Sequence, residues 1–296
     1  GLASVISFLI FILLNDLLFS ILYLDYLVLG IGLFLIGFVD DIKVKFSPKA
    51  RLIFMTAFLL ICVKIFSIQI NGIDLYFLNK IISINIFYVF FIILCFLFII
   101  NGSNLIDGFN GLLAFQLIII NSILLFINIE NELQTISIFI TAQIIILLVF
   151  LLFNFPTAKL FMGDGGAYLF GTLTALNVIE TNNLNPNTSS FFYCILLFYL
   201  FFEVFFSFFR KLIQKKSPIK PDGEHLHMLT YKLLKIGKPT KDCNYQNTLL
   251  INFTYCLLVF PSILLKESGA LCKYWFFSLI IIYIFTYFRL NSFVKK

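Results

Sequence analysis

Charged side chains are scarce in this sequence. Only 12% of its 296 residues are charged, where a soluble domain has about 25%, while 61% are hydrophobic. The mean hydropathy is +1.03. A water-soluble fold cannot hide this much apolar surface, which excludes a soluble domain. We therefore predict an all-α, polytopic integral membrane helical bundle.

Histidine and closely spaced cysteines are also scarce. The chain has two histidines and six cysteines, and no two cysteines form a C-x-x-C pair. A zinc site normally draws on several such ligands, so the sequence argues against one. The cysteines fit small apolar packing residues better than disulfides.

Long apolar runs are abundant, and many approach the roughly 20 residues that cross a bilayer as a helix. We expect ten spans within a single transmembrane domain, residues 1–296. They fall near residues 2–21, 23–39, 51–68, 85–101, 111–128, 135–153, 166–180, 190–209, 247–265 and 271–288. The chain opens on Gly1, not Met, and we expect one further helix and a loop upstream of it.

Basic residues concentrate in alternate connections between these spans. Of the 21 Lys and Arg residues, 17 lie in these connections and in the C-terminal tail. The segments are residues 40–51, 101–111, 153–165, 210–246 and 289–296. By the positive-inside rule they face the cytoplasm. The net charge of +6 is therefore a topology signal, and we predict no nucleic-acid partner.

The first two of these connections carry acids and amides next to a helix end. Asp40 and Asp41 directly follow a span, and they either form a proton-accepting or divalent-ion site or balance nearby lysines. Asn104, Asp107 and Asn110 precede the next span, where they either cap a helix or bind a planar group such as a nucleobase.

The later connections add a glycine-rich acid and both histidines. "FMGDGGAY" places Asp164 among three glycines. Glycines let backbone N–H groups approach an anion, and an acid there would repel phosphate unless a cation lay between. This pattern predicts phosphate with Mg²⁺ bound by Asp164, or else a capped turn. His225 and His227 bind a diphosphate or lie in a solvated loop, and Glu203, inside a span, is a functional candidate without an assigned role.

Taken together, four motifs in this order resemble the polyprenyl-phosphate N-acetylhexosamine-1-phosphate transferases, the MraY/WecA-type superfamily. The motifs are G-F-x-D-D, N-x-x-N-x-x-D-G-x-x-G-L, N-x-P-x-x-x-x-F-M-G-D-x-G and H-x-H. They stand at Gly37–Asp41, Asn101–Leu112, Asn154–Gly166 and His225–His227. The resemblance implies transfer of a sugar-1-phosphate from a UDP-sugar to polyprenyl phosphate, with release of UMP.

The resemblance also implies roles for individual residues. Asp164 would be the principal ligand of Mg²⁺, for which Mn²⁺ could substitute, and Asp40 the base or phosphate-orienting acid, with Asp41 in the same site. His225 and His227 would contact the diphosphate or the sugar. The uridine pocket would consist of Asn104, Asp107, Asn110, Asn154 and Phe161, the last of these stacking on uracil. The implied partners are a UDP-sugar and a polyprenyl phosphate such as undecaprenyl phosphate, and the resemblance allows a homodimer.

The implied setting is the bacterial cytoplasmic membrane, with the active site on its cytoplasmic face, in the first membrane step of O-antigen, capsule or similar glycan synthesis. We prefer direct attack of the lipid phosphate on the β-phosphorus, and a covalent phospho-aspartate route stays open. H-x-H in place of three histidines disfavours the muramyl-pentapeptide transferase, which is the alternative.

Two alternatives belong to other classes. An ion- or proton-coupled transporter predicts acids near the middle of spans, whereas here they gather on one face. A CDP-alcohol phosphatidyltransferase would need D-G-x-x-A-R, and "DGFNGLLA" has no arginine at that place.

Overall fold

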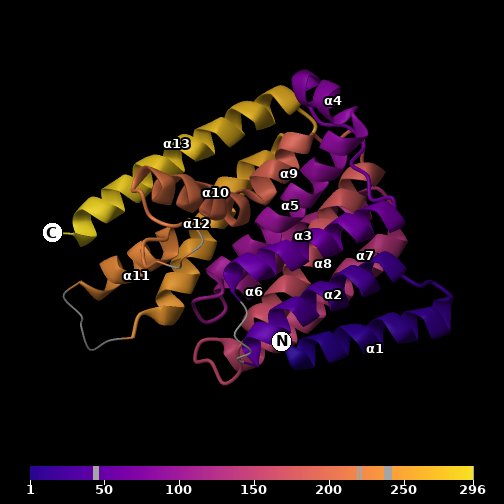
Figure 1. The fold of residues 1–296 in the computed structure, drawn as a ribbon, viewed down its shortest axis with the longest axis horizontal. Helices are drawn as coiled ribbons and strands as arrows, with labels where there is room; N and C mark the ends of the chain where they lie inside the picture. The colour runs from indigo at the N-terminus through magenta and orange to yellow at the C-terminus, as the bar shows by residue number, and fades with distance from the viewer. Residues whose placement is uncertain (43–46, 219, 221, 237–241, 296) are drawn as a thin grey trace.

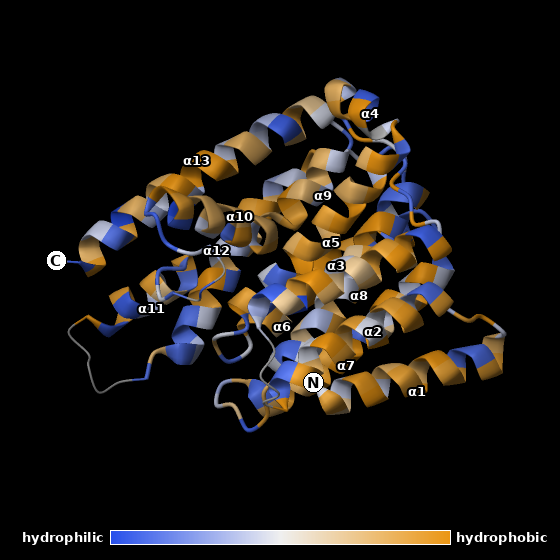
Figure 2. Ribbon diagram, in the orientation of Figure 1, coloured by the Kyte–Doolittle hydropathy of each residue, from blue (hydrophilic) through white to orange (hydrophobic). Residues whose placement is uncertain are grey.

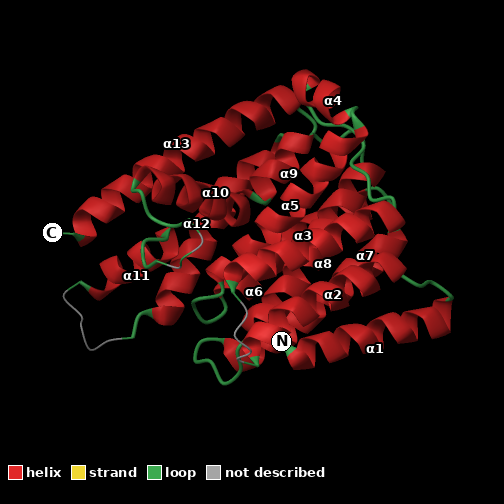
Figure 3. Cartoon of the chain, viewed as in Figure 1, coloured by secondary structure: helices red, strands yellow, loops and turns green. Residues whose placement is uncertain are grey.

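The computed structural model describes residues 1–42, 47–218, 220, 222–236 and 242–295, and the described chain is entirely helical (Figures 1 and 3). Its helices are α1 (Leu2–Phe19), α2 (Leu24–Asp41), α3 (Pro48–Ile65), α4 (Tyr76–Ile82), α5 (Asn85–Ile106), α6 (Leu112–Glu130), α7 (Gln134–Asn154), α8 (Gly163–Leu184), α9 (Ser190–Leu196), α10 (Phe198–Ile213), α11 (Leu226–Lys235), α12 (Asn244–Leu264) and α13 (Gly269–Val294). The predicted all-α class is confirmed.

Six helices among the described residues are long and apolar enough to cross a membrane: α1, α5, α6, α7, α12 and α13. The pair α9 and α10, bent by 74° at its break, makes a seventh candidate. The other predicted spans coincide with α2, α3 and α8. However, α2 and α3 each contain three charged residues, and α8 is rich in Gly, Thr and Asn. The fold is a polytopic membrane bundle, and the count of ten spans remains a prediction.

The outer surface of the bundle is apolar, as a lipid-facing surface requires. Figure 2 shows hydrophobic residues along most of α1 and much of α13. Leu17 and Ile281 on these helices are 78% and 69% exposed. Soluble monomers rarely expose such contiguous apolar patches, so these faces agree with a bilayer environment.

Several helices extend beyond the ends that the sequence predicted for the spans. α2 continues through Asp41, and α3 begins at Pro48, where the Ser47 hydroxyl caps the helix by accepting the Ala50 N–H at 3.2 Å. α5 continues to Ile106, and the connection 210–246 contains α11. Apolar periodicity misplaced the start of α3 because a polar cap, rather than an apolar residue, defines it. Residues 43–46, 219, 221 and 237–241 of these connections lie outside the described part of the chain.

α8 is the central helix, buried along most of its length. Small residues let its neighbours approach closely. A Cβ on Gly37 of α2 would lie 2.7 Å from the backbone of Asp164, so the two helix backbones meet there. A Cβ on Gly171 of α8 would lie 2.8 Å from the Ser103 hydroxyl oxygen and 3.2 Å from the Ile100 Cα of α5. These approaches bring the acid-bearing ends of α2 and α8 and the amide-bearing end of α5 together.

Buried amides fix the position of α8 within the bundle. Asn177 Nδ2 donates to Asn121 Oδ1 of α6 at 2.7 Å and to Gln143 Oε1 of α7 at 2.9 Å. One turn further along, Asn128 donates to Thr181 at 2.9 Å. An unpaired amide in an apolar interior is costly, so these contacts oppose sliding of α8 and hold its first turn in place.

Candidate active site

Asp164, in the first turn of α8, is the centre of a cluster formed by four helices. Arg51 Nη1 of α3 donates to Asp164 Oδ2 at 2.6 Å, and Asn104 Nδ2 of α5 donates to Oδ1 at 2.7 Å. The same Arg51 nitrogen lies 2.6 Å from Asp40 Oδ2 at the end of α2. We call Asp40, Arg51, Asn104 and Asp164 the Asp164 cluster; it brings together three of the predicted site residues.

Asp41 points to a different target from Asp40. Its carboxylate accepts the backbone N–H groups of Asp164 and Gly165 at 2.9 and 3.0 Å. Gly163, just before them, has φ +71°, and a Cβ there would lie 2.7 Å from the same carboxylate. A negative charge on the free N–H groups of a helix start is stabilising, so Asp41 anchors the turn that presents Asp164.

The carboxylates of this region are crowded. Burial, together with the charges of Asp164 and Asp41, raises the pKa of Asp107 to about 8. Burial also raises the pKa of Asp164, as does its neighbour Asp40, while hydrogen bonding from Asn104 and the charge of Arg51 oppose the rise. The site therefore binds an added phosphate favourably only if positive charge accompanies it.

The donors present fit Mg²⁺ held jointly with a ligand. Among the described residues, no three or more His, Cys, Asp and Glu side chains are grouped so as to hold a metal by themselves. Mg²⁺, however, is usually bound through one or two carboxylates together with substrate phosphates and water. Asp40 and Asp164, which share one guanidinium nitrogen, supply such a pair.

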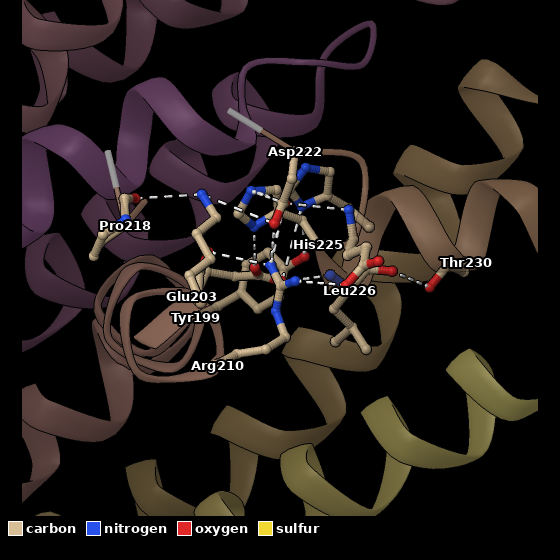
Figure 4. Close-up of polar contacts among 12 residues, drawn as sticks. Tyr199, Glu203, Arg210, Pro218, Asp222, His225, Leu226 and Thr230 are labelled. Atoms are coloured by element: carbon tan, nitrogen blue, oxygen red, sulfur yellow. Dashed lines mark hydrogen bonds and ion pairs between the residues drawn. The ribbon is translucent and has the colours of Figure 1, made fainter. Parts of the chain in front are cut away.

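A second cluster surrounds the histidines (Figure 4). Glu203 of α10 has Oε2 3.2 Å from His225 Nδ1, and its Oε1 accepts the Leu226 N–H at 3.0 Å. His225 Nε2 lies 3.4 Å from Asp222 Oδ1. The His225 and His227 rings stack with centroids 5.6 Å apart and planes 3° from parallel. Both imidazoles are buried, at 4% and 0% exposure, so they are not part of a solvated loop.

Arg210 ties this second cluster to α10. It donates to both oxygens of Asp222, at 3.1 and 2.8 Å, and to Glu224 at 2.7 Å. Although burial raises the pKa of Asp222, the hydrogen bond and charge of Arg210 lower it overall. Lys211 donates to the Lys220 carbonyl at 2.7 Å. The chain around Asp222 is therefore held against the helix by charge-assisted bonds.

A cavity of about 720 Å³ connects the two clusters. It is lined by three members of the Asp164 cluster, Asp40, Arg51 and Asn104, and by Lys211, Asp222 and His225. Its remaining wall is largely apolar and includes Leu94, Leu97, Phe98, Val204 and Phe208. A charged floor beside a hydrocarbon wall suits a ligand that carries both phosphate and an apolar chain.

Two residues predicted for the uridine pocket brace the loops near this cavity. Asn154 is buried; its Oδ1 accepts the Gly111 N–H at 2.5 Å and its Nδ2 donates to the Leu160 carbonyl at 2.6 Å. Asn110 Nδ2 donates to the Pro156 carbonyl at 3.0 Å. Their amides thus join the α5–α6 turn to the connection before α8, and contact with a nucleotide remains a prediction.

The other predicted uridine residues differ in exposure. Phe161 is 74% exposed, so its ring is free to stack on a planar ligand. Asp107 follows the last residue of α5, close enough to Asp164 and Asp41 for their charges to shift its pKa. Asn104 is already engaged with Asp164.

Sequence reasoning missed the basic members of both clusters. In the sequence, Arg51, Arg210 and Lys211 contributed only to the excess of basic residues on the predicted cytoplasmic side. In the structure, Arg51 and Lys211 line the cavity, and Arg210 forms an ion pair with Asp222. One signal was present. Arg51 falls in the first turn of a helix that opens with Ser-Pro, where a basic residue opposes the helix dipole and so suggests an anionic partner.

Comparison with known proteins identifies the family of the chain. Residues 23–182 match the model of glycosyl transferase family 4. An undecaprenyl-phosphate alpha-N-acetylglucosaminyl 1-phosphate transferase of Thermotoga maritima is 29% identical over 238 residues, which are 77% of this chain and 66% of the relative. A phospho-N-acetylmuramoyl-pentapeptide-transferase of Dictyoglomus turgidum is 31% identical over 212 residues, 68% of this chain and 66% of the relative.

A shorter match adds a third relative. A probable undecaprenyl-phosphate N-acetylglucosaminyl 1-phosphate transferase of Bacillus subtilis is 29% identical over 142 residues, 47% of this chain and 38% of the relative. The chain thus spans 66% of the length of the first two relatives. The family model covers more than half of the chain, and the predicted resemblance is confirmed. The chain belongs to glycosyl transferase family 4.

Proposed function

We propose that this protein transfers an N-acetylhexosamine-1-phosphate from a UDP-sugar to a polyprenyl phosphate such as undecaprenyl phosphate and releases UMP. The observation that supports this most directly is the cavity of about 720 Å³, which has an acid and a base from each cluster beside an apolar wall. This reaction would be the first membrane step of an O-antigen, capsule or related surface glycan, and Asp164 would be the central ligand of the metal.

The acceptor lipid fits the cavity by its chemistry. Its hydrocarbon chain would lie along Leu97, Phe98 and Phe208, and its phosphate near Arg51. Arg51 and Lys211 would offset part of the charge that two phosphorylated substrates bring together. When bound at Asp164 and Asp40, Mg²⁺ would neutralise charge on the phosphates.

The reaction we propose is a direct displacement. A phosphate oxygen of the lipid forms a bond to the β-phosphorus, the bond from that phosphorus to the bridging oxygen breaks, and UMP leaves with the bridging oxygen. Asp40 would orient the attacking phosphate through Arg51. Both Asp40 and Asp164 are hydrogen-bonded to Arg51, which supports these orienting and metal-binding roles over attack by a carboxylate.

The remaining predicted residues surround the donor. Phe161, exposed at 74%, would stack on uracil, with Asp107 and Asn104 close by. Asn110 and Asn154 would shape the pocket through the backbone. His225 and His227 would serve the diphosphate and sugar end. The cytoplasmic orientation and the ten-span topology belong to the same proposal, supported by the bias of basic residues toward the motif face.

A second candidate differs only in its donor. The Dictyoglomus relative is named as a phospho-N-acetylmuramoyl-pentapeptide-transferase and is 31% identical, so this donor is tested alongside the first. The single H-x-H pair, His225 and His227, favours the N-acetylhexosamine donor.

The test is UMP release by the purified full-length protein with undecaprenyl phosphate, Mg²⁺ and a panel of UDP-sugars that includes the muramyl-pentapeptide donor. Asp164→Asn should abolish turnover while leaving the thermal unfolding temperature nearly unchanged. Glu132→Gln, in the turn after α6 at the opposite end of the bundle, is the control. Near-normal turnover of D164N across a Mg²⁺ titration would refute the metal assignment, and no UMP with any donor would refute the function.

A further inference from the structure

Glu203 has a chemical environment that the proposed reaction does not by itself explain. It lies in α10, the second half of the bent pair, and is 1% exposed. A buried carboxylate is costly in free energy unless it is hydrogen-bonded or paired with a positive charge. We therefore looked for the groups that stabilise the Glu203 carboxylate and for its role.

The Glu203 carboxylate contacts two neighbouring residues, His225 and Leu226. Oε2 lies 3.2 Å from His225 Nδ1, and Oε1 accepts the Leu226 N–H at 3.0 Å, in the first turn of α11 (Figure 4). His227 Nδ1 is further away, at 3.9 Å from Oε1. Burial lowers the pKa of His227 to about 4, so that ring is neutral at physiological pH. The nearer ring, His225, is thus the hydrogen-bonding partner of Glu203.

The other side of the His225 ring is also constrained. Its Nε2 lies 3.4 Å from Asp222 Oδ1, and Asp222 is itself fixed by Arg210 through two hydrogen bonds. The stacked His227 ring covers one face of the His225 ring. Asp222 and His225 both line the cavity that reaches the Asp164 cluster. The ring therefore has one orientation, with one nitrogen toward Glu203 and the other toward the Asp222 side.

We propose that Glu203 is a positioning residue that keeps a proton on Nδ1 of His225 and thereby directs the Nε2 edge of the ring toward the cavity. A carboxylate has only acceptor atoms, so a nitrogen that is hydrogen-bonded to one carries the hydrogen. The Glu203 contact with Nδ1, at 3.2 Å, decides between the two nitrogens, because the Asp222 oxygen near Nε2 is further away, at 3.4 Å, and already accepts from Arg210. The partner of one imidazole nitrogen sets the state of the other. That the Nε2 edge meets a phosphate of the substrates rests on the proposed function; the relation between Glu203 and His225 does not.

Nitrogen-15 NMR of the full-length protein in detergent tests this directly. The chain has only two histidines, so histidine-selective labelling yields two imidazoles, which His227→Gln assigns. In the wild type we expect His225 Nδ1 to be protonated. In Glu203→Gln, the side-chain oxygen still accepts the Leu226 N–H, and the NH₂ group then faces Nδ1. Nδ1 should then accept a hydrogen bond from this NH₂ group, and the ring hydrogen should lie on Nε2.

Thr230→Val is the matched control. It removes a buried hydroxyl of α11 that donates to the Leu226 carbonyl at 2.9 Å, and it should leave both imidazole signals in place. A bare Nδ1 on His225 in the wild type would overturn the proposal even if E203Q fails to fold. A protonated Nδ1 in folded E203Q would overturn it as well.

Measurements of turnover test the positioning role separately from the proposed function. E203Q should lower kcat for UMP release by tenfold or more, roughly the scale of a misdirected acid–base or donor group, with a smaller change in KM. Glu203→Asp, which keeps the carboxylate, should recover part of the loss. If the wild type shows the expected His225 signal but releases no UMP, the proposed function fails and the positioning role stands. If UMP is released and E203Q matches the wild type in kcat, the positioning role fails.

Discussion

The Asp41 carboxylate accepts the backbone N–H of Asp164 at 2.9 Å, so the acid next to Asp40 holds in place the start of α8, which carries the proposed metal ligand. The two adjacent acids at the end of α2 thus have different partners. Asp40 faces Arg51 and the cavity, while Asp41 binds the start of α8 through the backbone. This division predicts different phenotypes for the two acids.

Asp41→Ala should destabilise the protein, whereas Asp40→Ala should mainly abolish turnover. D41A leaves two N–H groups at the α8 start without their acceptor, a loss of about 1–2 kcal/mol for a helix cap. Asp41→Asn keeps one acceptor and should lie between D41A and the wild type. Thermal and denaturant unfolding in detergent measure the difference. Greater destabilisation by D40A than by D41A would contradict the assignment.

Arg51 should compete with added cations for the two carboxylates of its cluster. It donates to Asp40 and Asp164 from the same nitrogen, at 2.6 Å each. Removing it in Arg51→Gln leaves two facing carboxylates without a positive partner. We expect Mg²⁺ to raise the unfolding temperature of R51Q more than that of the wild type, and turnover to fall by about 100-fold.

Lys49→Gln is the control for Arg51, because Lys49 begins the same helix but is exposed. It should show the wild-type response to Mg²⁺. An equal Mg²⁺ shift in R51Q and the wild type would mean that the arginine does not stand in for a cation.

The predicted site residues that the structure brings together share one property: each belongs to a short motif at a helix end. Asp40, Asn104 and Asp164 converge as expected because the ends of α2, α5 and α8 meet. Arg51 was not foreseen, since its partners lie on other helices and a basic residue near a helix end also fits the positive-inside pattern.

For Glu203, the sequence identified an unusual residue but not its partner. Its position inside an apolar run marked it as unusual, but its partner His225 lies 22 residues away, across a connection whose course the sequence does not specify. Nor does composition reveal the 74° bend between α9 and α10, which follows from tertiary packing. Local patterns identify elements and motifs, whereas contacts between distant elements need the fold.

Gly37→Ala should separate α2 from α8. The added methyl would lie 2.7 Å from the carbonyl carbon and oxygen of Asp164 and from the Gly165 nitrogen, and backbone atoms cannot rotate away. We expect a loss of about 1–3 kcal/mol in stability, as for overpacked interiors, and reduced turnover because Asp41 and Asp164 move apart. Gly108→Ala, where a Cβ meets nothing within 4 Å, is the control for stability. Equal unfolding temperatures for G37A and G108A would contradict the close approach.

His227 should make the protein less stable as the pH falls from about 6.5 to about 4. Burial lowers its pKa to about 4 in the folded protein, while an unfolded chain has a value of about 6.5. In that window the unfolded state binds the proton first, so acid favours unfolding. The groups that face the ring are the Tyr199 hydroxyl, Glu203 and the stacked His225, with Phe109 at its edge.

The effect is isolated by comparing wild type with His227→Gln, which cannot titrate. The difference in unfolding free energy between the two should change by up to about 3 kcal/mol between pH 7 and pH 4, with the wild type losing more. The histidine-selective NMR signal of His227 should stay that of a neutral ring down to about pH 5. Parallel pH profiles of stability for the two proteins would contradict the prediction, because they would mean that the pKa of His227 is the same in the folded and unfolded states.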